Sequence, residues 1–112
     1  MANRPTRFFS SRQEKKVAKA VGGKTVANSG AARFVAGDVT TDKVLIECKT
    51  CTKEQKTFTI KRDWITKNRD EAFSVGKQYS AVVIDFGDGE QHYIISEKMF
   101  QEWLKSLDND GT

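Results

Sequence analysis

Two carboxylates and a lysine fall within one short stretch of the chain. Asp38 precedes a turn, and the apolar run after the turn carries Glu47 and Lys49 two residues apart. Successive side chains of a strand point to opposite faces, so Glu47 and Lys49 would share one face. If Asp38 lies on an adjoining strand or turn, its carboxylate can converge with that of Glu47. Converging carboxylates suit Mg²⁺ or Mn²⁺, and an ammonium beside such an ion can orient or deprotonate water or neutralise developing charge.

The same residues have a plainer interpretation. Glu47 and Lys49 can form an ion pair on a surface strand, with a hairpin turn at Thr41-Asp42. Acidic and basic residues are common, so an Asp, eight intervening residues and a Glu-x-Lys make a weak pattern by themselves.

Cysteine and histidine usage argues against a zinc site. Cys48 and Cys51 form one C-x-x-C, and His92 is the only histidine. Zinc needs four ligands of the nitrogen and sulfur type, which this set does not supply. We therefore expect two reduced, structural cysteines and a structural histidine.

Length and hydropathy indicate one globular domain. The chain has 112 residues, of which 38% are hydrophobic. This is enough for a modest core. We find no apolar run near the ~20 residues of a membrane span and no secretory signal, so we expect a cytoplasmic protein.

Charge is distributed unevenly along the chain. Residues 1–33 hold eight basic residues against the single acid Glu14, and the remainder holds 11 basic and 14 acidic residues. A concentrated basic segment is typical of proteins that bind a polyanion, although solvated helix faces are also often basic.

Hydrophobic periodicity predicts the elements that would position these residues. We expect a basic arm over 1–9, followed by a helix over 11–21. Ser10 or Ser11 would cap that helix, with Glu14 completing a capping box and Gly22-Gly23 ending it. Val17, Ala20 and Val21 would form its inward face. The other predicted elements are strands over 24–28, 44–49, 57–61, 79–86 and 91–95, helices over 63–75 and 97–107, and a tail over 108–112.

Further details follow from the pattern of the second half of the chain. Asp63 would cap the helix over 63–75, and its residues Trp64, Ile65, Ala72 and Phe73 would face inward. Gly87-Asp88-Gly89 would form a hairpin turn, and Ser96 would cap the last helix. That helix carries an apolar stripe that we expect to be core or dimer surface, formed by Met99, Phe100, Trp103 and Leu104. The resulting order is α-β-β-β-α-β-β-α.

Together the order and the spacings resemble the PD-(D/E)xK nucleases, in particular the archaeal-type Holliday junction resolvases and their viral relatives. The resemblance covers roughly residues 10–95, and Gly37 stands where the family usually has proline. The positions that match the family are Glu14, Ser29, Asp38, Glu47 and Lys49. The resemblance implies a restriction-endonuclease-like α/β (α+β) core, with a mixed sheet of about five strands flanked by helices over residues 10–107.

The resemblance also implies roles for these residues. Asp38 and Glu47 would bind Mg²⁺, for which Mn²⁺ can substitute, and the Cys48 carbonyl and Glu14 are further candidate ligands. Lys49 would assist the attacking water or the transition state. Ser29 would hydrogen-bond a phosphate, although it can also be a turn serine, just as Glu14 can be a helix cap.

The expected substrate is a four-way DNA junction, cut by metal-activated water. Two symmetric nicks imply a two-fold homodimer. Contacts to the DNA backbone, each of which can instead be a solvated charge, are expected from Arg12, Lys15, Lys16, Lys24 and Arg33. The alternatives are another PD-(D/E)xK nuclease of nicking, repair or restriction type, and a non-catalytic DNA-binding module on the same scaffold.

Overall fold

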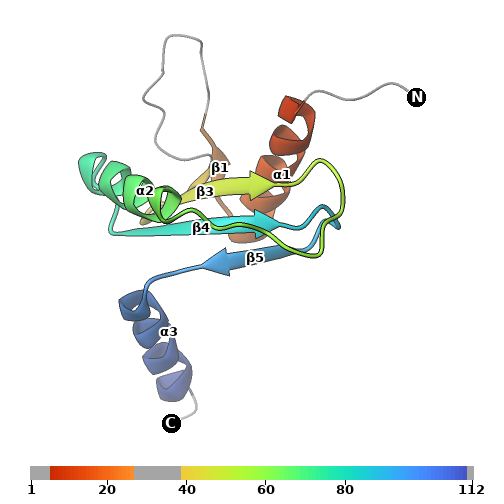
Figure 1. The fold of residues 1–112 in the computed structure, drawn as a ribbon. Helices are drawn as coiled ribbons and strands as arrows, with labels where there is room; N and C mark the ends of the chain where they lie inside the picture. Colours follow the sequence, from red (N-terminus) through yellow and green to blue (C-terminus); the bar gives the residue numbers. More distant parts are fainter. Residues whose placement is uncertain (1–5, 27–38, 111–112) are drawn as a thin grey trace.

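A mixed β-sheet lies at the centre of the molecule (Figure 1). The computed structural model describes residues 6–26 and 39–110, and within them five strands and three helices. The expected α+β class with a mixed sheet is thereby confirmed. In chain order the elements are α1 (Thr6–Val21), β1 (Lys24–Thr25), β2 (Val39–Thr40), β3 (Val44–Thr50), α2 (Arg62–Ser74), β4 (Tyr79–Asp85), β5 (Gln91–Ile94) and α3 (Glu97–Asp110).

The strands follow one another across the sheet in chain order, β1-β2-β3-β4-β5. β3 and β4 are parallel, and α2 makes the crossover between them, whereas the other neighbouring pairs are antiparallel. In the β2–β3 pair Val39 lies opposite Ile46, and in the β3–β4 pair Glu47 lies opposite Val82. β3 therefore has a neighbour on each side.

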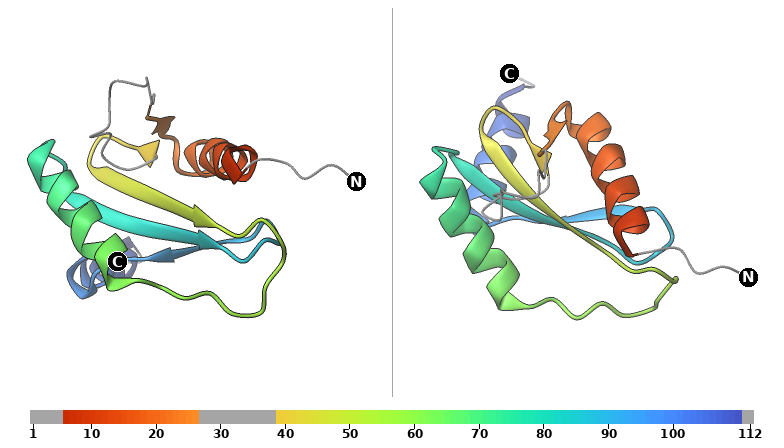
Figure 2. Two further views of the ribbon diagram at one scale, coloured as in Figure 1. Left: turned by 45° about the horizontal axis from the view of Figure 1, so that its top comes forward. Right: turned by 90° about the horizontal axis from the view of Figure 1, so that it is seen from above.

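Helices α1 and α2 lie on opposite faces of the sheet (Figure 2). On the α1 face, Ile46 and Cys48 of β3 belong to one buried cluster with Val17 and Ala18 of the helix. The period of two in β3 thus sends Ile46 and Cys48 toward α1 and leaves the residues between them for the α2 face. The cluster is completed by Val39, Ala81 and Val83.

On the α2 face, a buried asparagine joins the helix to two strands. Asn68 is fully buried, and its Nδ2 donates to the backbone carbonyls of Leu45 at 3.2 Å and Ala81 at 2.9 Å. Ala72 is buried one turn further along. A polar group with no access to water needs such partners, so α2 has one favourable position above β3 and β4.

The predicted turns form as expected. In the β4–β5 turn the Asp85 carboxylate accepts hydrogen bonds from the backbone N–H groups of Gly87 and Gly89 at 2.8 and 3.0 Å. Both glycines have positive φ, which side chains disfavour. The hydroxyl of Ser96 accepts a bond from the Met99 N–H at 3.1 Å and so caps α3.

The segment 57–61 is not a strand, so that prediction was wrong. β3 and β4 each have two partners, and the segment adds to neither of the strands at the open edges of the sheet, β1 and β5. Within the segment only Phe58 is partly covered, and its ring packs edge-to-face on Trp64 and Phe86. Apolar and polar residues do alternate over 57–61, but only the Phe58 ring is held against the protein, and the segment is a loop.

Several helix boundaries differ from expectation. α1 begins at Thr6, so the residues from Thr6 onward that were expected in the arm are helical, and Ser10 and Ser11 lie inside the helix instead of capping it. α2 begins at Arg62 after Lys61, without a side-chain cap, so Asp63 lies in the first turn. α3 continues to Asp110.

Three predicted inward residues face solvent. Ala18 is buried in place of Ala20 and Val21, and Phe73 is 85% exposed. None of the helices in the described part of the chain has the length and apolarity that a membrane span requires.

Candidate functional site

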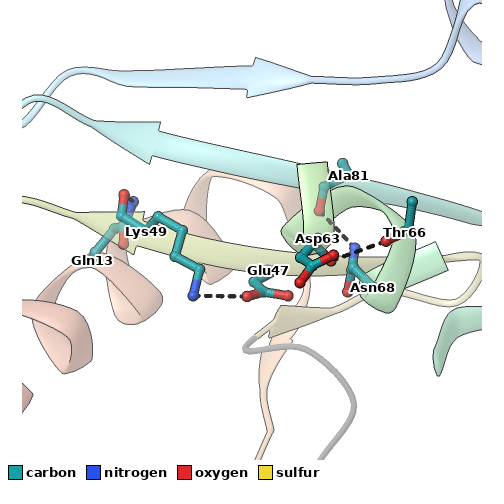
Figure 3. Close-up of polar contacts among 7 residues, drawn as sticks. All are labelled: Gln13, Glu47, Lys49, Asp63, Thr66, Asn68 and Ala81. Carbon is teal, nitrogen blue, oxygen red and sulfur yellow. Dashed lines mark hydrogen bonds and ion pairs between the residues drawn. The ribbon is translucent and has the colours of Figure 1, made fainter. Parts of the chain in front are cut away.

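Glu47 and Lys49 form an ion pair on the α2 face of β3. The Lys49 Nζ lies 2.9 Å from the Glu47 Oε2, and Figure 3 shows both side chains leaving the strand on the same side. This arrangement agrees with the alternation predicted from the sequence. The Lys49 side chain is 31% exposed and the Glu47 side chain 19% exposed, so the pair lies at the margin of the core, open to solvent on one side.

An aromatic ring from α2 also contacts this lysine. The Lys49 Nζ lies 4.8 Å from the centroid of the Trp64 ring, within the range of a cation–π interaction. Trp64 is held by Phe58, whose ring centroid lies 6.1 Å away in an edge-to-face contact. The ammonium is thus fixed between a carboxylate and an indole, in a position that the sheet and α2 define together.

Three expected site residues, Ser29, Arg33 and Asp38, lie outside the residues that the structure describes. Strand β2 begins at Val39, the residue after Asp38 in the sequence, and Val39 pairs with Ile46, the residue before Glu47.

Glu14 lies on α1, which packs on the face of the sheet opposite to the Glu47–Lys49 pair. Its neighbour Gln13 is buried, and the Gln13 Nε2 donates to the Lys49 carbonyl and to the Gln91 side chain, both at 2.9 Å. α1 is therefore attached to the backbone of the strand that carries the pair.

The other expected ligand, the carbonyl of Cys48, lies in β3 between Glu47 and Lys49. Within residues 6–26 and 39–110, no three His, Cys, Asp or Glu side chains come together in a way that could hold a metal ion.

The basic residues expected to contact DNA are exposed along α1 and β1. Arg12, Lys15 and Lys16 lie on the helix and Lys24 on the strand, all open to solvent. Lys16 is also used within the protein, because its Nζ donates to the Gly89 carbonyl at 2.7 Å. These residues can present positive charge to a polyanion without moving the backbone.

A pocket of about 210 Å³ opens between α1, the end of β3 and the β4–β5 turn. Its lining includes Arg12, Gln13, Cys51 and Asp85. Burial raises the pKa of the Cys51 thiol above its usual value, and the Asp85 carboxylate adds to this. The thiol is thus protonated at neutral pH, and both cysteines are free.

Sequence reasoning missed the roles of Gln13 and Asn68. Each donates to a β3 carbonyl far away in the chain, at Lys49 and Leu45. Only their position on the apolar side of an otherwise polar helix could have drawn attention to them.

In comparisons with protein-family models, curated proteins and solved structures, no match to this chain was found.

Proposed function

We propose that this chain is a Mg²⁺-dependent endonuclease of the PD-(D/E)xK superfamily, with a restriction-endonuclease-like core, that cuts four-way DNA junctions as a homodimer. The observation that supports the proposal most is the Glu47–Lys49 pair on a central strand, with Trp64 against the lysine. A carboxylate and an ammonium at this depth are costly in a strand otherwise rich in apolar residues.

The β2–β3 register supports including Asp38 in the proposed metal site. Val39 and Ile46 are opposite one another in an antiparallel pair, and we propose that the pairing continues by one residue, which would set Asp38 opposite Glu47. Directly opposite residues of an antiparallel pair share a face of the sheet. Carboxylate oxygens from both residues, with the Cys48 carbonyl, are the ligand types that Mg²⁺ prefers.

Glu14 has a less direct place in this proposal, because α1 covers the other face. Through Gln13 the helix holds the carbonyl of Lys49, which fixes the strand at the proposed site. Ser29 and Arg33 remain proposed phosphate contacts, together with the exposed basic residues Arg12, Lys15, Lys16 and Lys24.

The bound cation would supply a water acidic enough to attack the phosphodiester. Lys49 would hold a phosphate oxygen or the attacking water by charge and hydrogen bonding. If Glu47 held the cation, its attraction for Lys49 would weaken, and the Trp64 ring would still hold the ammonium beside Glu47. Lys49 would then be free to contact a phosphate oxygen of the substrate.

The test is a cleavage panel of four-way, flap, nicked and linear duplex DNA with Mg²⁺. We expect cleavage of the four-way junction, and loss of cleavage without loss of binding in Asp38→Asn, Glu47→Gln and Lys49→Ala. Glu54→Gln, at an exposed loop position, is the matched control. Normal cleavage by Glu47→Gln would refute the metal assignment, and equal cutting of linear duplex would refute junction selectivity.

A non-catalytic DNA-binding module is the second candidate. The observations that favour it are that Glu47 is already paired with Lys49, and that the described residues contain no group of three His, Cys, Asp or Glu side chains that could hold a metal ion. It predicts that the wild-type protein binds branched DNA and leaves it intact at every Mg²⁺ or Mn²⁺ concentration. The same panel therefore separates the two candidates.

A further inference from the structure

Helix α3 leaves the sheet after β5 and projects away from the other two helices (Figure 1). Four large apolar side chains on it are 39–51% exposed, namely Phe100, Trp103, Leu104 and Leu107. Their spacing puts them on one face of the helix. We call these four residues the α3 stripe.

The opposite face of α3 is the polar one, and it is turned toward the protein's own body. The hydroxyl of Tyr79, at the start of β4, donates to the Glu102 carboxylate. By helical spacing, Lys98 and Lys105 lie on this side with Glu102 and away from the stripe. An amphipathic helix of 14 residues that turns its polar face to its own domain is not stabilised by that domain's core.

A second exposed apolar patch lies at the end of α2. Phe73 is 85% exposed and Val75 is 52% exposed. The exposed Arg69 lies one helical turn before Phe73 on the same side of α2. We call these three residues the Phe73 patch.

The two surfaces are complementary in charge. The edge of the α3 stripe beside Leu104 carries Glu97 and Asp108, at spacings that place both next to the apolar side chains. Two α3 stripes packed antiparallel against each other would bring these acids together, which is unfavourable. The Phe73 patch offers Arg69 on one side of Phe73 and the exposed Asp70 on the other, so the acidic edge of a partner's stripe suits the Arg69 side of the patch.

The exposed apolar area of the two surfaces is also large enough for a stable dimer. The exposed portions of the α3 stripe and of Phe73 and Val75 amount to roughly 550 Å² in each molecule. A standard interface buries about 800 Å² on each partner, of which about 60% is apolar. A two-fold arrangement uses both surfaces of both molecules, so the whole of this area is covered.

We propose that a second copy of this chain covers these surfaces reciprocally, with the α3 stripe of each molecule packed on the Phe73 patch of its partner. This inference rests on the homodimer of the proposed function for its biological use. It specifies the surfaces that join the subunits, and its test measures molecular mass and not cleavage. Loss of nuclease activity and loss of the dimer are therefore separate results.

The experiment is sedimentation of the full chain across micromolar concentrations. The wild type is expected to be a dimer, and Leu107→Glu and Phe73→Ser are each expected to shift it to monomer. Lys105→Ala, on the polar face of α3, is the matched control and should remain dimeric. Circular dichroism checks the fold, which these surface positions should leave intact.

A charge exchange tests the pairing of the two surfaces. Arg69→Glu is expected to raise the dimer dissociation constant about tenfold. Adding Glu97→Lys and Asp108→Lys to this variant should restore most of the lost dimer affinity. A monomeric wild type, or a dimer that survives Leu107→Glu, would overturn the proposal. Dissociation by Leu107→Glu without any effect of Phe73→Ser would overturn the reciprocal arrangement.

Discussion

The role of Asn68 can be tested by three substitutions that differ in the hydrogen bonds they allow. Its Nδ2 donates to two carbonyls, while its buried Oδ1 has no hydrogen-bond partner among the described residues. Asn68→Ala loses both bonds and leaves a small cavity, which together cost about 2–4 kcal/mol. Asn68→Leu loses the same bonds but also removes the unpaired oxygen and fills the space, so we expect a loss of only about 1 kcal/mol.

Asn68→Asp should be the most damaging of the three. It places a carboxylate against the carbonyls of Leu45 and Ala81, with no donor and no water, at a cost of several kcal/mol. The buried site also raises the pKa of the introduced carboxyl, because only the protonated acid can donate to a carbonyl. A raised pKa in the folded state means that stability is present at low pH and lost as the pH rises through that pKa.

Urea unfolding followed by far-UV circular dichroism measures these differences. With a slope of about 1.5 kcal/mol per molar urea, the Asn68→Ala midpoint should fall by about 2 M. The deficit of Asn68→Asp should exceed this at pH 7 and shrink toward pH 4, whereas the deficit of Asn68→Leu should not depend on pH. Equal midpoints for Asn68→Asp and Asn68→Leu at pH 7 would refute the assignment of Asn68 as a donor to both strands.

Two further predictions concern the site and the pocket beside it. Trp64→Leu removes the ring beside Lys49, an interaction of about 0.5–1 kcal/mol, so single-turnover junction cleavage should fall about two- to fivefold. Trp64→Phe should keep most of the rate. Unchanged cleavage by a folded Trp64→Leu would exclude a role for the ring. Because burial raises the pKa of the Cys51 thiol, its alkylation by iodoacetamide at pH 7.5 should be slower in the folded than in the urea-unfolded chain, with Cys51→Ser as the control. For the same reason, the free energy of unfolding should decline as the pH rises through that pKa. Equal alkylation rates in the folded and unfolded chain would contradict the burial of this thiol.

Local sequence patterns correctly predicted the features of the fold that depend on neighbouring residues alone. The apolar run over 44–49 predicted the strand β3, and the alternation of strand side chains predicted the shared face of Glu47 and Lys49. The alternation over 57–61 did not predict a strand correctly, because a strand also needs a partner edge, and this segment does not reach the edges at β1 or β5. The start of α1 was misplaced because serine favours cap positions, while here the helix begins at Thr6 and carries Ser11 in its interior.

Contacts between residues far apart in the chain could not be predicted from the sequence. Trp64 was expected to face inward, but its position over Lys49 depends on where the whole of α2 is set. The helix stripe at Phe100 and Trp103 was recognised as apolar, and only the structure shows that it faces away from its own domain.

The strand that carries the proposed site is held from both faces at the residues around Glu47. Asn68 of α2 binds the carbonyl of Leu45, two residues before Glu47, and Gln13 of α1 binds the carbonyl of Lys49, two residues after it. A partly exposed ion pair contributes at most about 1 kcal/mol, whereas fully burying two apolar side chains there would contribute about 3–6 kcal/mol. The chain thus gives up stability at one strand position while fixing that position with buried amides from two helices. Such a combination supports the proposed site, because proteins often give up stability where side chains are arranged for chemistry.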